Sequence, residues 1–293
     1  MDEVRRVLVV LLAASAAAAV TVALAHERRD DRASRAAPRE AQALPAPDAA
    51  LPRTPDGLAA ALTATTRRLR DALRRWDTSA AVPRDVTYLA LHHQRMLRLM
   101  AARRALGDAT LARLPRDVRG EARDTVLAQR SLAAIPRARH RPRVRVASAA
   151  PAAELRRDYG VAQNRFGVHW SVLASINLVE SAFGRIRSAS EAGARGPMQF
   201  LPSTWRRYGM GGDIDDPRDA ILAAANYLRT GGAAHDLDRA LFAYNHSTSY
   251  VRAIRRFAGR MRADERTFLT YYAWQVFVRT PTASRRLTGP GRR

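Results

Sequence analysis

The sequence predicts a mainly helical protein. Apolar residues recur at spacings of three and four over most of the chain from residue 55 onward, which is typical of amphipathic helices. Prolines and stretches rich in Gly, Pro and Asp separate these periodic segments, as loops separate helices. The 293 residues are enough for one or two domains that each bury a core.

The first residues form a segment that is typical of protein export. Val7 to Ala25 is an unbroken run of apolar and small residues, preceded by Arg5 and Arg6. Its last three residues, Ala-Leu-Ala, fit the pattern at which signal peptides are cleaved, and its length approaches the roughly 20 residues that span a bilayer. Residues 1–25 are therefore a signal peptide or a signal anchor, and the sequence leaves open which. Both place the remaining chain outside the cytoplasm, and an uncleaved segment would contact the membrane.

Composition divides the remainder of the chain into four parts. Residues 26–54 are rich in Ala, Pro, Arg and acidic residues without an apolar period, which predicts a disordered linker. Residues 55–134 are predicted as a helical unit of unknown role, with three helices. Residues 135–152 are a basic linker that contains prolines, and residues 153–290 form a second domain.

The second domain is expected to be helical, with an extended end. Its expected helices lie at about 153–166, 169–183, 203–208, 216–230, 236–246 and 248–261. The final apolar segment, Phe268 to Val278, is expected to be a short strand or an extended arm.

The net charge of +23 is extreme, and every basic residue is Arg. Arg and Ala abundance together are typical of a GC-rich genome, so codon bias is one explanation. Attraction to a polyanion, such as an anionic wall polymer, is the other. The charge is spread along the chain without a cluster of interleaved aromatics, so nucleic acid is not favoured as a partner. The absence of cysteine excludes disulfides, a thiolate nucleophile and cysteine metal sites.

Glu180 is the candidate catalytic residue. It shares one face of a predicted apolar helix with Leu173 and Ile176, so desolvation should raise the pKa of its carboxyl group. Gly184 is the expected end of this helix, which places Glu180 near the partial negative charge of the helix C-terminus. Both effects favour the protonated form that a general acid needs. The alternative is a surface glutamate on a helix of different phase.

Two later segments supply polar side chains. Gly196-Pro197-Met198-Gln199-Phe200 is a turn that leads into a helix, where glycine permits close backbone approach and the Gln199 amide can bind a sugar hydroxyl or acetamido group. In Ala243-Tyr244-Asn245, the last two residues offer hydrogen-bonding groups at a helix end. The alternatives are that Met198 and Phe200 are core residues and that Tyr244 and Asn245 belong to a structural network.

Together these motifs resemble a known family. Glu180-Ser181, Gly196 to Gln199 and Ala243 to Asn245, in this order and spacing, resemble the catalytic domain of soluble lytic transglycosylases over about residues 155–260. That family has a lysozyme-like, mainly helical α+β fold and cleaves the β-1,4 bond between N-acetylmuramic acid and N-acetylglucosamine in peptidoglycan. Pro197 departs from the family's motif, as do His246-Ser247, so the backbone after Asn245 is expected to differ.

The resemblance implies a mechanism without a metal or a cofactor. Glu180 protonates the glycosidic oxygen and then acts as base on the C6 hydroxyl of muramic acid, which closes a 1,6-anhydro ring. No second carboxylate is required, unlike in ordinary glycosidases. Tyr244 and Asn245 would hold Glu180 and the acetamido group. The sugar cleft would be lined by Ser181, Met198, Gln199 and Phe200, with Trp205 and Trp274 as candidate stacking platforms.

Alternative functions remain open from the sequence. Asp213, Asp215 and Asp216 resemble the start of a calcium loop, although a turn and capping role is preferred because no Glu occupies the twelfth position. One of them as a second catalytic carboxylate would make the protein a hydrolytic, lysozyme-type muramidase. His92-His93 is expected to be solvated or to pack rather than to bind metal, because adjacent helical residues point apart. A non-catalytic scaffold that binds the cell wall through residues 55–134 is the third reading.

Overall fold

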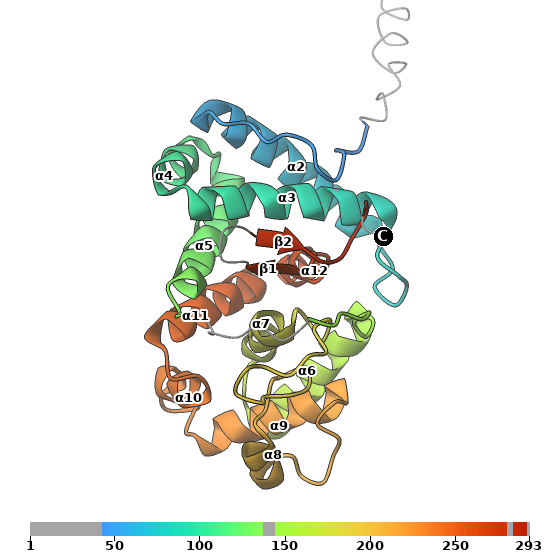
Figure 1. Cartoon of the computed structure of the whole chain (residues 1–293), viewed down its shortest axis with the longest axis vertical. Helices are drawn as coiled ribbons and strands as arrows, with labels where there is room; N and C mark the ends of the chain where they lie inside the picture. Colours follow the sequence, from blue (N-terminus) through green and yellow to red (C-terminus); the bar gives the residue numbers. More distant parts are fainter. Residues whose placement is uncertain (1–42, 137–143, 280–283, 292–293) are drawn as a thin grey trace, which may run out of the picture. The chain divides into compact units, whose positions relative to one another are not determined.

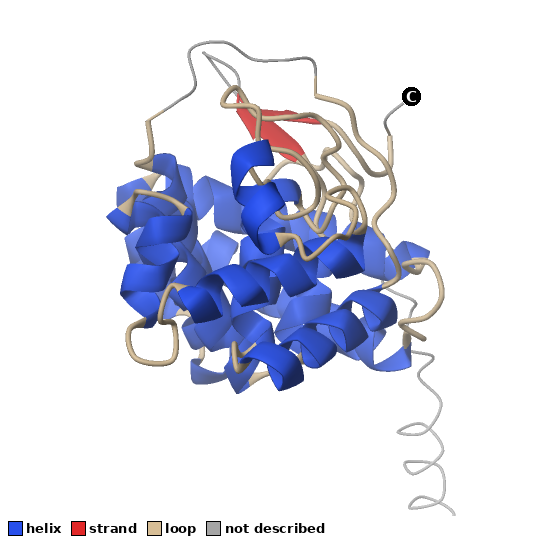
Figure 2. Ribbon diagram, turned by 90° about the horizontal axis from the view of Figure 1, so that it is seen from below, coloured by secondary structure: helices blue, strands red, loops and turns tan. Residues whose placement is uncertain are grey.

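A computed structural model of the chain describes residues 43–136, 144–279 and 284–291. These residues form eleven helices and one two-stranded hairpin, so the predicted mainly helical fold is confirmed (Figure 2). The export or anchor segment 1–25 lies outside the described residues, as does most of the 26–54 linker. Within the described ranges, no helix is long and apolar enough to cross a membrane. Residues 45–293 form one compact unit by themselves.

The helical unit at 55–134 contains four helices in the described chain, where three were expected. They are α2 (Pro55–Arg75), α3 (Arg84–Ala102), α4 (Arg104–Arg113) and α5 (Arg116–Ala133). The additional break falls at Arg103, where no proline signals it. A Cβ at Gly107 would lie 2.2 Å from the carbonyl oxygen of Met100, so only glycine lets α4 fold back against the end of α3. The approach of Gly107 to Met100 does not show in the spacing of apolar residues, so the sequence did not predict this break.

The His92-His93 pair lies on α3, where a solvated or packing role was expected. His93 is buried, His92 is half-buried, and burial lowers the pKa of both imidazoles. Neither belongs to a group of metal-ligating side chains among the described residues.

Seven helices build the second domain, and six of them match the expected ranges to within three residues. They are α6 (Ala152–Phe166), α7 (Trp170–Ser181), α8 (Pro202–Tyr208), α9 (Pro217–Thr230), α10 (Leu237–Tyr244), α11 (Thr248–Ala263) and α12 (Arg266–Tyr272). Helix α7 packs against α6, α9, α11 and α12, and Figure 1 draws it among them. Every side chain from Trp170 to Asn177 is buried, so α7 is the central helix of this domain.

The expected short strand or extended arm at Phe268 to Val278 is wrong for the first half of the segment and confirmed at its end. Its first half is helix α12, because Phe268 and Tyr271 bury their rings against Phe183 and Phe257 at centroid distances of 5.5 and 5.2 Å. Only the end is extended. Strands β1 (Phe277–Arg279) and β2 (Ser284–Arg286) pair antiparallel, with Phe277 opposite Arg286.

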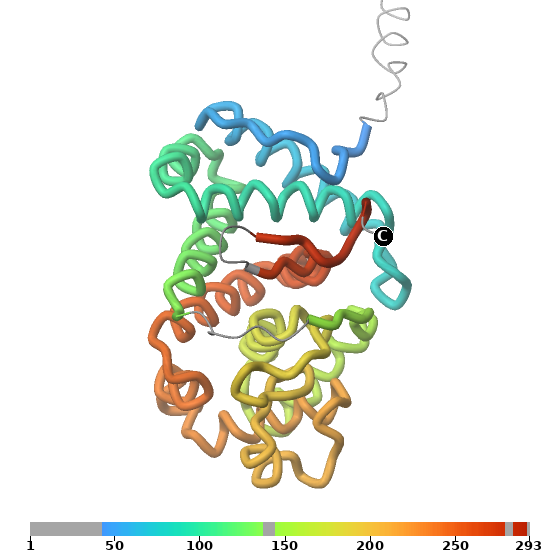
Figure 3. The backbone as a smooth tube through the Cα atoms, viewed as in Figure 1, coloured from blue at the N-terminus to red at the C-terminus, as the bar shows by residue number. Residues whose placement is uncertain are grey.

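The helical unit packs directly against the second domain. Helix α11 contacts both α5 and α7, and the tube in Figure 3 shows α5 leading directly toward α11. The Gln94 side chain on α3 donates to the Gln275 carbonyl oxygen and accepts from the Gln275 amide, both at 2.9 Å. The described end of the basic linker is extended and pairs with the chain after α7, through Ala147 N to Arg185 O at 2.9 Å. Residues 55–134 therefore form one wall of the same compact unit.

Candidate active site

Glu180 lies in the last turn of α7, as the sequence predicts, but the helix ends three residues earlier than Gly184. Ala182 and Phe183 adopt left-handed backbone conformations with φ of 52° and 63°. The Phe183 amide donates to the Asn177 carbonyl oxygen at 3.0 Å, which closes the helix before the glycine is reached. Such conformations are costly for side chains other than glycine, and they cluster at functional sites.

The Glu180 carboxyl group lies in an environment that favours its protonated form. Burial raises its pKa from the ordinary 4.5 to about 7, and the hydrogen bond from the Tyr250 hydroxyl to Oε1, at 2.7 Å, offsets part of that rise. Within the described part of the chain, no charged side chain contributes to this shift. A carboxyl group with a pKa near neutrality can both give and take a proton, which suits a general acid and base.

The loop of residues 196–200 comes close to the end of α7. Gly196 has φ of 75°, and a Cβ there would lie 1.9 Å from the Ile214 carbonyl oxygen, so the predicted close approach requires glycine. Gln199 is also left-handed, with φ of 51°, and its side-chain amide donates to the Gly196 carbonyl oxygen at 3.0 Å. The turn therefore holds Gln199 in a fixed, half-buried position.

A buried hydrogen-bond network joins this loop to α7. The Pro197 carbonyl oxygen accepts from the Ser181 hydroxyl and from the Asn177 side-chain amide, the latter at 2.8 Å. The Asn177 side-chain oxygen accepts in turn from the Tyr159 hydroxyl at 2.6 Å. Ser181 also accepts from the Gly184 amide at 2.7 Å. The network fixes the distance between the helix that carries Glu180 and the loop that carries Gln199.

Two of the residues expected to line a sugar cleft are buried. The side chains of Ser181 and Met198 are 0% exposed. The Ser181 hydroxyl is fully engaged in the network, and the Met198 backbone carbonyl oxygen accepts from the Tyr244 hydroxyl at 2.7 Å. Ser181 and Met198 therefore position the site, and their side chains do not contact a ligand.

Three other predicted residues line a cavity of about 230 Å³. Its lining residues are Gln199, Phe200, Leu201, Thr204, Tyr227, Ala243, Tyr244 and His246. The Tyr244 ring lies 5.9 Å from that of Phe200 and 5.4 Å from that of Tyr227, so aromatic faces and edges form one wall. Burial and then the nearby Glu180 carboxyl raise the pKa of Tyr244, which places this cavity beside Glu180. Concave sites with apolar walls and a few polar groups are typical of ligand binding.

Asn245 ends helix α10 in an extended conformation and is half-buried. Its side-chain amide makes no hydrogen bond to a described residue, so it is available to a ligand. Ser247, part of the departure from the family motif, caps α11 by accepting from the Tyr250 amide at 3.3 Å. The altered sequence after Asn245 therefore begins the helix that presents Tyr250 to Glu180.

The sequence reasoning missed Tyr250, Asn177 and Tyr159. Asn177 carries a usable signal, since it is an amide inside an apolar helix one turn before Ser181. Tyr250 has no such signal, because an aromatic residue near the start of an amphipathic helix is most simply interpreted as core. The contact with Glu180 joins residues 70 positions apart.

Two of the three aspartates after the loop, Asp213 and Asp216, have the turn and capping roles that were preferred. Asp216 caps α9 by accepting from the Asp219 amide at 2.9 Å, and Asp213 accepts from the Asp215 amide at 2.9 Å. Asp215 pairs with Arg195 at 2.8 Å. No cluster of metal-ligating side chains occurs in the ranges that the structure describes.

The candidate stacking residues Trp205 and Trp274 have different environments. Trp205 is half-buried and lies 5.5 Å from the Phe200 ring. Trp274 is only 7% exposed and packs against Tyr271 at 4.7 Å. A ring buried to that extent offers little face for a sugar.

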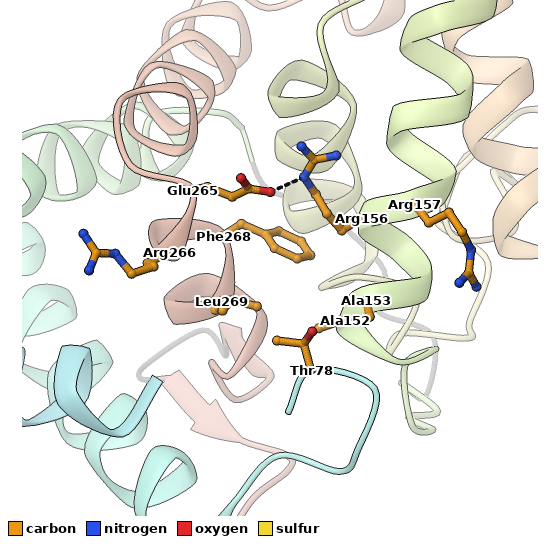
Figure 4. Close-up of a pocket in the computed structure, with 9 residues that line it drawn as sticks. All are labelled: Thr78, Ala152, Ala153, Arg156, Arg157, Glu265, Arg266, Phe268 and Leu269. Carbon is orange, nitrogen blue, oxygen red and sulfur yellow. Dashed lines mark hydrogen bonds and ion pairs between the residues drawn. The ribbon is translucent and has the colours of Figure 1, made fainter. Parts of the chain in front are cut away.

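A larger cavity of about 530 Å³ lies elsewhere, between the loop after α2, the start of α6 and helix α12 (Figure 4). Its single acid, Glu265, is held in an ion pair by Arg156. Phe268 and Leu269 form its apolar side, while the Arg157 and Arg266 side chains point away. Without an unpaired acid, this cavity lacks the group that acid catalysis needs, so the site around Glu180 is the candidate active site.

Comparison with known proteins agrees with this geometry. Residues 159–266 match the family model for the transglycosylase SLT domain. No curated protein and no solved structure matched the chain. Residues 159–266 belong to this family of lysozyme-like lytic transglycosylases. The matched segment contains Glu180, Gln199, Asn245 and Tyr250, whereas the helical unit lies outside it.

Proposed function

We propose that this protein is a peptidoglycan lytic transglycosylase that cleaves the β-1,4 bond between N-acetylmuramic acid and N-acetylglucosamine and leaves a 1,6-anhydro end. The proposal depends most on one observation: burial raises the pKa of Glu180 to about 7, and its hydrogen-bond partner is the neutral Tyr250 hydroxyl rather than a charged group. Such a group can act as acid in one step and as base in the next.

The chemical steps follow from this single carboxyl group. Glu180 gives its proton to the glycosidic oxygen, the bond from that oxygen to C1 of muramic acid breaks, and positive charge develops at C1. The resulting carboxylate then takes the proton of the C6 hydroxyl as O6 bonds to C1. The Tyr250 hydroxyl, 2.7 Å from Oε1, stabilises the carboxylate between the two proton transfers. Glu180 is protonated again at the end, and no water is consumed.

A hydrolytic mechanism has less support. Ordinary glycosidases use a second carboxyl group roughly 5 to 10 Å from the first. In the described residues, no acidic side chain contributes to the pKa of Glu180. The three candidate aspartates are already engaged in a helix cap, a turn and an ion pair.

The remaining predicted site residues take two roles in this proposal. Gln199, Phe200 and Tyr244 line the cavity beside Glu180 and meet the sugar. The unpaired amide of Asn245 binds the acetamido group. The Ser181 hydroxyl holds the loop against α7 by donating to the Pro197 carbonyl oxygen, and the Met198 carbonyl oxygen joins the loop to Tyr244 of α10.

The substrate sets the location of the protein. Proteins with this domain act on peptidoglycan in the cell envelope, and we propose an extracytoplasmic location reached through residues 1–25 as signal peptide or anchor. Anionic wall polymers are a second proposed partner, attracted by the net charge of +23. Wall association that does not weaken with added salt would exclude that electrostatic attraction.

The test is a mass-spectrometric analysis of purified peptidoglycan digested by the full chain. Anhydro products, one water lighter than reducing-end products, are expected, and Glu180→Gln should yield neither. Reducing ends alone would replace the proposal with a muramidase. Wall binding without any cleavage would replace it with a scaffold.

A further inference from the structure

Tyr159 is a buried side chain of α6 whose hydroxyl group reaches the helix that carries Glu180. It is 0% exposed, packs edge-on against the Phe268 ring at 6.1 Å, and places its hydroxyl 2.6 Å from the Asn177 side-chain oxygen. Asn177 is also 0% exposed and lies one turn before Ser181 on α7. Neither Tyr159 nor Asn177 lines the cavity beside Glu180. Any contribution of this pair to the site must therefore pass through other residues.

The Asn177 amide has one favourable orientation in this network. The Pro197 carbonyl oxygen, 2.8 Å from the Asn177 side chain, can only accept, so the amide nitrogen must face it. The amide oxygen then faces Tyr159, whose hydroxyl must donate. A reversed amide would place its oxygen against the Pro197 oxygen, and a buried acceptor without a donor is costly. The Tyr159 hydroxyl thus selects the orientation in which Asn177 holds Pro197.

The turn of residues 196–200 depends on this contact for its position. Within the described chain, its hydrogen bonds to other elements run through two carbonyl oxygens, that of Pro197 to α7 and that of Met198 to Tyr244 of α10. Its other hydrogen bonds lie within the turn or join it to the residue before it. Gln199 has φ of 51°, a conformation that residues other than glycine keep only where the surroundings enforce it. A weakened Pro197 contact would therefore let Gln199 move.

We propose that Tyr159 is a positioning residue of the active site: by fixing the Asn177 amide, it holds the turn from which Gln199 meets the sugar. The proposal rests on the proposed function, because it concerns the position of a side chain that binds the glycan. Glu180 lies outside this chain of contacts. Burial and the Tyr250 hydroxyl are the causes of the pKa shift of Glu180, and neither Tyr159 nor Asn177 contributes to it. Tyr159 therefore acts on sugar binding and not on proton transfer.

Kinetics on soluble glycan strands, released from peptidoglycan by an amidase, test this role. Tyr159→Phe keeps the ring but removes the donor, so KM should rise about threefold to tenfold, the range of one hydrogen bond. The value of kcat should stay within about twofold, because lost uniform binding raises KM alone, and the pH–rate profile should stay in place. A variant that merely folded less well would show the opposite pattern, since a smaller active fraction lowers the apparent kcat and leaves KM unchanged.

Tyr271→Phe is the matched control. It removes a similarly buried hydroxyl, which is hydrogen-bonded to Thr125 at 2.7 Å and lies away from the turn. Its KM should equal that of the unchanged protein. An unchanged KM in Tyr159→Phe, or an equal rise in Tyr271→Phe, would overturn the proposal.

A double-mutant cycle tests whether Tyr159 acts through Asn177. Asn177→Leu removes the amide and should raise KM by itself. Adding Tyr159→Phe to Asn177→Leu should raise KM no further, because the hydroxyl then has no amide oxygen to fix. Full additivity of the two changes would overturn this chain of contacts.

Glycan binding without cleavage separates a failure of this proposal from a failure of the proposed function. The same strands are titrated calorimetrically into Glu180→Gln and into Glu180→Gln combined with Tyr159→Phe, and the second should bind about threefold to tenfold more weakly. Equal or undetectable affinities, with cleavage by the unchanged protein, would overturn the positioning role and leave the proposed function standing. If the unchanged protein cleaved nothing, the proposed function would fail. Weaker binding by the combined variant would then still support the positioning role, and equal or undetectable affinities would overturn it.

Discussion

The two ends of helix α11 contact acidic side chains in opposite ways. Near its start, Tyr250 donates a neutral hydrogen bond to Glu180 at 2.7 Å. Two and three turns later, Arg256 and Arg260 pair with Asp124 of α5 at 3.4 and 2.9 Å. The first contact leaves the acid with a pKa of about 7, whereas the second supplies two positive charges to a carboxylate.

The comparison shows what an acid site requires in a chain of this composition. With 50 basic residues, an acidic side chain of this protein most readily meets a guanidinium group. A cation beside Glu180 would favour the ionised form and remove the proton that catalysis needs. The hydrogen-bond partner of Glu180 is instead the neutral Tyr250 hydroxyl. The neighbouring hydrogen-bond network is also built from hydroxyls and amides, those of Tyr244, Asn177 and Ser181. The start of α11 thus serves the catalytic acid through a neutral hydrogen bond, whereas its end stabilises the fold through ion pairs.

Removing the acid is expected to have the largest effect. Glu180→Gln should lower the rate of peptidoglycan cleavage by about 10³-fold or more, because one group supplies both proton transfers and each is typically worth 10² to 10⁴. Turbidity loss of purified cell walls measures it. Glu265→Gln, which removes an acid held by Arg156 in the other cavity, is the matched control and should retain activity. If Glu180→Gln retained activity, the site where Tyr250 of α11 contacts Glu180 would not be the catalytic site.

The same group should make stability depend on pH. The folded-state pKa of Glu180, about 7, exceeds its ordinary 4.5, so the folded protein holds a proton that the unfolded chain has released between these values. The stabilisation is full below about pH 4.5 and is lost as the pH rises through about 7, by at most about 3 kcal/mol at 1.4 kcal/mol per pKa unit. Unfolding of the unchanged protein and Glu180→Gln, followed from about pH 4 to about pH 8, should therefore diverge in favour of the variant. Parallel curves would refute the raised pKa.

The Tyr250 hydrogen bond should affect both the rate and its pH dependence. Tyr250→Phe removes a bond that favours the charged form, so the pKa of Glu180 should rise and the fall in activity above neutrality should move to higher pH. The maximal rate should drop about tenfold, because a hydrogen bond to the intermediate carboxylate is lost. Tyr88→Phe, on α3 and away from the site, should leave the pH–rate profile in place. A lower rate with an unshifted profile would mean that Tyr250 has only a structural role.

The sequence predicts those helices whose apolar residues repeat at helical spacing. Six of the seven helices of the second domain were expected nearly where they lie, because apolar spacing and capping residues are local signals. The break at Arg103 and helix α12 were missed, since the first depends on the approach of Gly107 to Met100 and the second on ring packing against Phe183. Tertiary contacts determine this helix break and this helix, and a short stretch of sequence does not reveal such contacts.

The site, like the fold, was predictable from the sequence only in part. Glu180 and its raised pKa follow from one carboxyl group on an apolar helix face, and Gly196 follows from the turn. The motif does not reveal which of its side chains face outward, so Ser181 and Met198 were expected in the cleft although both are buried. Tyr250 required knowledge of a contact across 70 residues.

The ion-paired end of α11 should affect stability and leave catalysis alone, and its expected effect is the smallest. Asp124→Asn removes partners from Arg256 and Arg260 at partly exposed positions, where such pairs contribute about 1 kcal/mol, so the melting temperature should fall by a few degrees. Cleavage rates should stay within about twofold, because Asp124 makes no contribution to the pKa of Glu180. Asp71→Asn, which breaks the more exposed pair with Arg74 on α2, should shift the melting temperature less. A large loss of activity in Asp124→Asn at unchanged stability would mean that the α5–α11 contact sets the position of Tyr250, and the two ends of the helix would then be one functional element.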